Sequence, residues 1–149
     1  MKRSGIKRVS SDPRKKAIAA LDRAFSKMIR ERDGIAGCIS CGAAIHEAGH
    51  FIRREAMSTR WNPVNVNGQC IRCNHFLSGN LFEYAIGLEA RYMKGMPFKL
   101  RAESKKMKTW EVKELEQLVA AAKMGSRVYN QVYNELYPLP ESRTLQAAA

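Results

Sequence analysis

The sequence predicts an α+β fold in which a small zinc-stapled core is flanked by an N-terminal helix and by long C-terminal helices. Four cysteines form two Cys-x-x-Cys pairs, at 38 and 41 and at 70 and 73, with 28 residues between the pairs. Four thiolates at this kind of spacing close a tetrahedral structural zinc site. Helical periodicity occurs on both sides of this segment, and 149 residues suffice for one domain with a modest core.

The first predicted element is a helix over residues 12–33, preceded by a disordered basic tail at 1–11. Asp12-Pro13 resembles a helix cap followed by a proline in the first turn. Apolar residues then recur at helical spacing up to Asp33. Its other face is basic (Lys15, Lys16, Arg23, Lys27 and Arg30). That basic face could lie on a phosphate backbone or face water.

Residues 35–95 form the predicted zinc core, within a single domain that spans 12–136. Few helical signals occur before Gly79, and glycines punctuate the segment. We expect a short strand near 44–52, a loop containing Trp61, the second cysteine pair, and then a helix with an apolar face.

The C-terminal third is predicted to be a basic connector at 96–108, a helical region at 109–136 and a tail at 137–149. Pro97 is interpreted as a turn, and Gly125 as the break or kink between helical parts. Three tyrosines, at 129, 133 and 137, lie along a wide apolar stripe. This stripe could be intramolecular core or the seam of a homodimer.

The charge predicts an acidic polymer as partner, and nucleic acid is the obvious one. The net charge is +12, and residues 1–33 carry eleven Lys or Arg against four acids. No run of 18 apolar residues indicates a membrane span, and the start lacks the apolar stretch of a signal peptide. Closely spaced cysteines without an export signal favour metal ligation in a reducing compartment, so we expect a cytoplasmic location.

A second site is predicted from His50 and two asparagines. His50 follows Gly49 near the expected strand end, Asn65 lies fifteen residues on, and Asn74 directly follows the last cysteine. Phosphodiester hydrolysis requires a base with a near-neutral pKa, which imidazole supplies, and a cation such as Mg²⁺ or Mn²⁺ to offset charge on the phosphate.

Histidine on a strand, asparagine in the following loop and asparagine at a helix start resemble the HNH, or ββα-metal, nuclease motif. The chain most closely resembles the lambdoid-phage NinG (Rap) recombination endonucleases, through its cysteine pairs, Ala48-Gly49-His50-Phe51 and Leu77-Ser78-Gly79-Asn80. The resemblance implies an enzyme, encoded by a phage or prophage, that cuts branched DNA (Holliday junctions and D-loops) during recombination in the bacterial host.

Carried over to this sequence, the resemblance implies His50 as general base, Asn65 as the HNH asparagine and Asn74 as a metal ligand, with Asn67 contesting the role of Asn65. Many HNH enzymes carry a metal-binding residue directly before the catalytic histidine, and here that position is Gly49. Glu47 is the nearest substitute. Strand alternation would put Glu47 and His50 on opposite faces unless Gly49 forms a bulge.

Further candidates surround these positions. His75 is an alternative metal ligand, and Asn80 could contact metal or DNA or cap a helix. Phosphate contacts are expected from four arginines (Arg53, Arg54, Arg60 and Arg72). Glu47 and Glu55 are the only acids in 34–80, which excludes a resolvase of the all-carboxylate, RNase-H-like type.

Three functions are compatible with these features. The leading interpretation is a metal-dependent, structure-selective DNA endonuclease. The alternatives are a non-catalytic zinc-stabilised module that binds branched DNA or RNA, and an HNH nicking endonuclease without branch preference.

Overall fold

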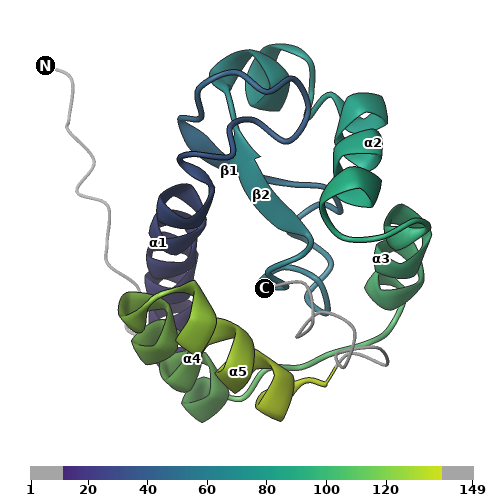
Figure 1. Cartoon of the computed structure of the whole chain (residues 1–149). Helices are drawn as coiled ribbons and strands as arrows, with labels where there is room; N and C mark the ends of the chain where they lie inside the picture. Colours follow the sequence, from purple (N-terminus) through teal and green to yellow (C-terminus); the bar gives the residue numbers. More distant parts are fainter. Residues whose placement is uncertain (1–11, 139–149) are drawn as a thin grey trace, which may run out of the picture.

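The structure, a computed structural model, describes residues 12–138 as five α-helices, one short π-helical turn and a two-stranded sheet (Figure 1). The predicted tails at 1–11 and 139–149 lie outside the described residues. In chain order the elements are α1 (Pro13–Asp33), β1 (Glu47–His50), β2 (Val66–Gln69), η1 (Arg72–Phe76), α2 (Leu81–Arg91), α3 (Met96–Ser104), α4 (Val112–Met124) and α5 (Ser126–Leu136).

Helix α1 begins where the sequence predicts. The Asp12 side chain accepts a hydrogen bond from the Arg14 backbone N–H at 2.9 Å, and Pro13 occupies the first turn. The helix buries an apolar stripe that includes Leu21, Phe25 and Ile29. The prediction of a helix at 12–33 is therefore confirmed.

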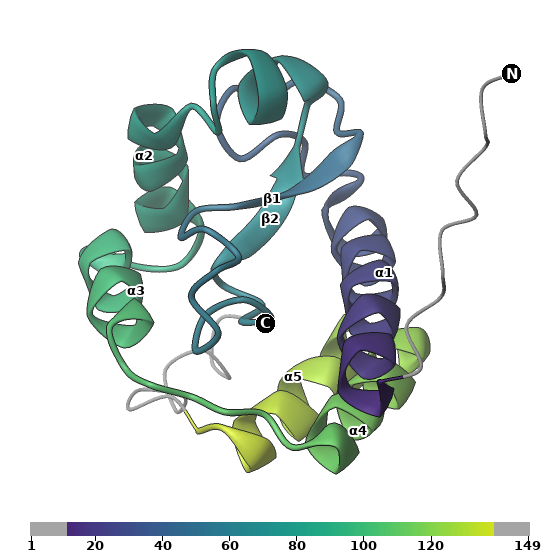
Figure 2. The same cartoon turned by 180° about the vertical axis from the view of Figure 1, so that it is seen from behind.

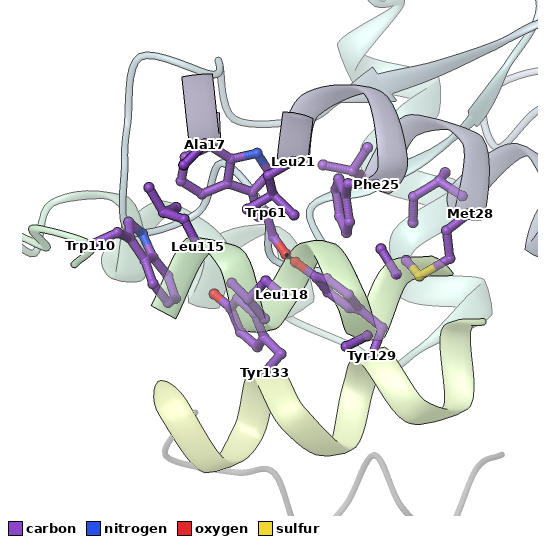
Figure 3. Packing of buried hydrophobic residues seen from close by; sticks show 14 residues of the cluster. Ala17, Leu21, Phe25, Met28, Trp61, Trp110, Leu115, Leu118, Tyr129 and Tyr133 are labelled. Carbon is purple, nitrogen blue, oxygen red and sulfur yellow. Dashed lines mark hydrogen bonds between the residues drawn. The ribbon is translucent and has the colours of Figure 1, made fainter. Parts of the chain in front are cut away.

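Helices α1, α4 and α5 enclose the main hydrophobic core (Figures 1 and 3). Its largest members are Trp61, Trp110, Tyr129 and Tyr133, all fully buried. Gly125 has a φ of 110° and separates α4 from α5, which confirms the predicted break.

The tyrosine stripe is part of this core and not a seam between two copies of the chain. The Tyr129 hydroxyl donates to the Trp61 carbonyl at 2.8 Å, and Tyr133 stacks on Tyr129 with ring centroids 6.0 Å apart. Helix α5 turns these rings into the core, because their burial supplies much of the buried apolar area of a small domain. The face that suggested a homodimer is thus unavailable for one.

The hairpin lies between α1 on one side and α2 on the other (Figures 1 and 2). Strand β1 pairs antiparallel with β2 in continuous register, from Glu47 opposite Gln69 to His50 opposite Val66. No bulge occurs at Gly49, so side chains alternate strictly between the two faces. Ala48 and Val66 pack into the α1 core, which identifies the face of the hairpin that α1 covers.

Two predicted boundaries need correction. The segment 96–108 is not only a connector, because it contains α3, and Pro97 lies in the first turn of that helix instead of marking a loop. Proline is tolerated there since the first turn needs no backbone donor. Met96 and Leu100 pack with α2. The domain also extends beyond 136, because the Tyr137 ring packs on Trp110.

Candidate functional site: a four-cysteine cluster beside a polar triad

The four cysteines converge into one cluster. Their sulfur atoms all lie within 4.8 Å of one another, and the Cys41 and Cys70 sulfurs are 3.7 Å apart. Tetrahedral zinc with Zn–S bonds of about 2.3 Å requires sulfurs about 3.8 Å apart. None of the four forms a disulfide. The cluster therefore has the ligands and the spacing to hold a metal ion such as zinc.

The backbone of each cysteine pair builds this arrangement. In the first pair, the Cys38 N–H donates to the Ala43 carbonyl and the Gly42 N–H donates to the Cys38 carbonyl, both at 2.7 Å. Gly42 adopts a φ of 78°, which favours glycine. In the second pair, the Cys73 N–H approaches the Cys70 sulfur at 3.4 Å. Both turns direct their thiols to one common point, with Cys41 on the exposed side.

The protein alone offers little to stabilise negative thiolates in the cysteine cluster. Burial raises the pKa of Cys73 to about 12. The Asn80 amide donates to the Cys73 sulfur at 3.4 Å, which favours the thiolate. A bound cation would supply the remaining compensation. Asn80 thus turns toward the cysteines, and although it begins α2 its side chain makes no capping hydrogen bond.

A polar triad formed by Glu47, Asn74 and His75 lies next to the cluster in sequence and in space. The Asn74 amide donates to a Glu47 oxygen at 2.6 Å, and His75 Nε2 lies 2.7 Å from the same oxygen. The hydrogen bond from Asn74 lowers the pKa of Glu47, so the group stays ionised at neutral pH. The triad brings together three of the predicted metal ligands, and it is accessible because His75 is exposed.

The position before His50 is occupied by Gly49, and a larger residue there would displace neighbouring side chains. Gly49 lies directly over the side chain of Gln69, and a Cβ at this position would also lie 3.0 Å from Asn74 Oδ1. The Tyr84 hydroxyl donates to the Gly49 carbonyl at 2.7 Å, which fixes the strand there. The carboxylate nearest to Asn74 and His75 is that of Glu47, which lies two residues before Gly49 on the same face of β1.

His50 lies on the other face of β1, toward α1. Its Nε2 is 2.9 Å from the Arg60 carbonyl; because a carbonyl only accepts, Nε2 carries the proton and Nδ1 is left as the basic nitrogen. Burial lowers the pKa of His50, which keeps the imidazole neutral at neutral pH. This electronic state suits a proton acceptor.

The expectation that His50 and Asn74 face one shared cation is not met. Since the register is continuous, Glu47 and Gly49 share one face of β1 and Ala48 and His50 share the other. Asn74 lies against Gly49 and Glu47, whereas His50 lines a cavity against α1. The strand itself separates the two side chains.

Asn65 and Asn67, which competed for one role, have distinct surroundings. Asn65 accepts from the Ile52 N–H at 2.8 Å and donates to the Ile52 and Thr59 carbonyls at 3.0 and 3.1 Å, so it spans the loop between the strands. Asn67 instead contacts residues of α1 and α2, including Arg32 and Tyr84. Asn65 is the asparagine that holds the loop whose Arg60 carbonyl orients His50.

The predicted DNA-contacting arginines differ in availability. Arg60 forms two contacts with Asp22, at 2.7 and 3.1 Å, and lies over the Trp61 ring, so it ties the loop to α1. Arg53, Arg54 and Arg72 are exposed. Their roles toward DNA stay predictions.

Sequence reasoning missed Asp22 as a residue of this region. It also accepts a hydrogen bond from the Trp61 indole at 2.9 Å, so one carboxylate on α1 holds two consecutive loop residues. A lone acid on a basic helical face was the available signal. Asp33, at the end of the same helix, accepts from the Gly68 N–H at 2.7 Å and fixes β2 in a similar way.

Within residues 12–138, no helix has both the length and the apolar character needed to cross a membrane. Partners and location beyond this finding stay predictions.

Comparison with known proteins identifies the family. The family model described as "Bacteriophage Lambda NinG protein" matches residues 2–131. Curated relatives named "Protein ninG" include those of Escherichia phage lambda, 38% identical over 90 residues, and Salmonella phage P22, 37% identical over 90 residues. Each alignment covers 58% of this chain and 44% of the relative, so the chain matches less than half the length of these relatives. No solved structure matches significantly. The chain belongs to the NinG family of phage proteins.

Proposed function

We propose that this NinG-family chain is a metal-dependent, structure-selective endonuclease that cuts branched DNA, such as Holliday junctions and D-loops, in phage recombination. The observation that carries the proposal is the polar triad: a carboxylate, an amide and an imidazole meet at the surface, beside a cluster suited to a structural zinc ion. The charge of +12 supports a polyanionic substrate.

The donor set fits a hard divalent cation held by few protein ligands. Glu47 and Asn74 offer oxygen atoms, which suit Mg²⁺ or Mn²⁺, and His75 offers a third position. Binding requires the Asn74 amide to turn its oxygen toward the cation, since its nitrogen now donates to Glu47. When bound, such a cation offsets charge that develops on the phosphate.

His50 acts as the base in this proposal. Its Nδ1 takes a proton from the attacking water, while the Nε2–H stays bonded to the Arg60 carbonyl and fixes the ring. Within residues 12–138, β1 has a strand neighbour on one edge alone. Because the triad and His50 lie on opposite faces of β1, cleavage by this pair requires one phosphate to be reached from both sides around the open edge of the strand.

A four-way junction assay tests the proposal. Wild-type protein with Mg²⁺ or Mn²⁺ is expected to cut the junction, and a linear duplex of the same sequence to be a poor substrate. His50→Ala is expected to bind the junction normally and to cut at least about 100-fold more slowly. Equal cutting by His50→Ala would remove His50 as the base, and equal cutting of linear duplex would remove the branch preference.

One observation favours a second candidate, a non-catalytic zinc-stabilised module that binds branched DNA or RNA. His50 and Asn74 lie on opposite faces of β1, and a binder needs no shared cation between them. The same assay separates the candidates, because the binder retains the junction but leaves it intact with every divalent cation tested.

A further inference from the structure

We infer that the groove between α1 and the β-hairpin is a binding site for the sugar-phosphate backbone of a nucleic-acid strand, with Arg23, Lys27 and Arg30 of α1 as phosphate contacts beside His50. The inference deepens the proposed function and rests on it for the identity of the ligand as DNA. It assigns α1 a recognition role in addition to its role in the core.

The groove is a half-open depression between α1, β1 and the loop that follows β1. It has a volume of about 540 Å³, within the range of about 300–1,000 Å³ typical of ligand sites. Its wall on the hairpin side includes His50 and Ala48, and its wall on the α1 side includes Arg23, Lys27 and Arg30.

The charges lining the groove select an anion. Four cationic side chains line it (Arg23, Lys27, Arg30 and Arg54), against one acid, Asp22. The charge of Asp22 is already matched by Arg60 at 2.7 Å. Within residues 12–138, Arg23 and Arg54 form no ion pair, and Lys27 makes only a loose, exposed one to Glu31 at 3.8 Å. The groove therefore has uncompensated positive charge.

The spacing of the cations suits a chain of phosphates better than a single anion. Residues 23, 27 and 30 lie four and three positions apart, so they share one face of α1. They extend about 10 Å along the helix axis, close to the rise of three nucleotides at about 3.4 Å each. A strand bound here would also bring a phosphate near His50, which lines the same cavity.

DNA binding without divalent cations tests this site independently of cleavage. The pocket variant Arg23→Gln/Lys27→Gln is compared with Lys15→Gln/Lys16→Gln, which removes the same charge from exposed positions of the same helix outside the groove. Anisotropy of a labelled four-way junction in EDTA is measured over a range of KCl. The pocket variant is expected to bind about tenfold more weakly, with a salt slope shallower by about 2, and the control to change less than twofold.

Several outcomes decide the matter. An unchanged affinity and slope in the pocket variant, or an equal loss in the control, overturns the inference. Competition by inorganic phosphate at constant ionic strength, with no preference for the oligonucleotide, identifies a small-anion site and overturns it too. If junction binding depends on the groove residues but wild-type protein does not cut, the result supports the groove as a binding site and rejects the nuclease function.

As a second readout, the NMR-measured pKa of His50 should rise when oligonucleotide binds, because a phosphate then lies nearby.

Discussion

The helical half of the molecule and the half that holds the candidate site are stabilised in different ways. Around α1, α4 and α5, large aromatic and aliphatic side chains fill a continuous core. Around the cysteines, the corresponding cluster contains only Cys38, Cys70 and Cys73 with Ile45 beside them. There Phe76 and Phe82 are 81% and 77% exposed, while Asn65, Asn67 and Gln69 are fully buried. A second, smaller apolar cluster lies in that half (Ile39, Val64, Tyr84, Leu88, Met96 and Leu100). Hydrogen bonds and thiols there supplement a smaller apolar core.

This difference suggests what a metal ion at the cysteine cluster would contribute to the fold. Buried amides stabilise a structure only when they are paired, and each pair contributes modestly. Gln69, for example, donates from its amide nitrogen to Ser40 Oγ at 2.9 Å and to the Gly79 carbonyl at 2.8 Å, while its buried Oε1 has no hydrogen-bond partner among residues 12–138. Such a network specifies a geometry without supplying much driving force. Zinc bound at the cysteine cluster would supply that free energy of folding and leave Glu47, Asn74 and His75 accessible at the surface.

The largest expected effect comes from loss of the cluster. Cys73→Ser, or chelation of zinc, should unfold residues 35–95, since metal binding contributes on the order of 10 kcal/mol to folding of such segments. Hydrogen exchange should show lost amide protection in β1 and β2, with more protection remaining in α4 and α5. Full protection of the hairpin after chelation would contradict the comparison between the two halves.

Next in size is the effect of the triad on cleavage. Glu47→Gln removes the charge but keeps the shape, and junction cleavage should fall at least about 100-fold with the melting temperature little changed. Glu55→Gln is the matched control, because Glu55 is exposed. Parallel losses in the two variants would argue against Glu47 as a ligand.

A matched pair of leucines sharpens the contrast in packing. Leu118 is fully buried in the helical core, whereas Leu81 at the start of α2 is 49% exposed. Leu118→Ala should lower the free energy of unfolding in urea by about 2–5 kcal/mol, and Leu81→Ala by less than about 1 kcal/mol. A loss above about 1 kcal/mol in Leu81→Ala would contradict the exposed position of this side chain.

The smallest effect concerns pH. Because the folded protein lowers the pKa of His50, the unfolded chain binds its proton more readily. The contribution of His50 to stability is then fully present above its usual pKa of about 6.5 and is lost as pH falls through the lowered value. Urea unfolding of wild type and His50→Gln between pH 7 and 5 should show a smaller loss of stability in the variant. Parallel curves would exclude this linkage.

Local signals allowed much of the fold to be predicted. Asp12-Pro13 marks the start of α1, Gly125 marks the break between α4 and α5, and the cysteine spacing predicts the cluster. Helix α3 was missed because Pro97 reads equally as a turn or as a first helical turn. The tyrosine stripe left two interpretations open, because a sequence does not say whether an apolar face packs on its own chain.

The sequence allowed the residue types of the candidate site to be predicted, but not which of these residues lie together in space. Which face of β1 each side chain occupies depends on strand register, and the continuous pairing separates His50 from Asn74. The approach of Asn74 to Glu47 joins residues 27 positions apart. Only the loop geometry distinguishes Asn65 from Asn67.

The carboxylate of Asp22 connects helix α1 to the imidazole of His50. It grips Arg60 and Trp61, and the carbonyl of that same arginine orients the ring of His50. A displacement of α1 along its axis would thus be passed from Asp22 to Arg60 and from the Arg60 carbonyl to the His50 ring. In the proposed function, a polyanion bound to that helix would thereby influence the orientation of the His50 ring.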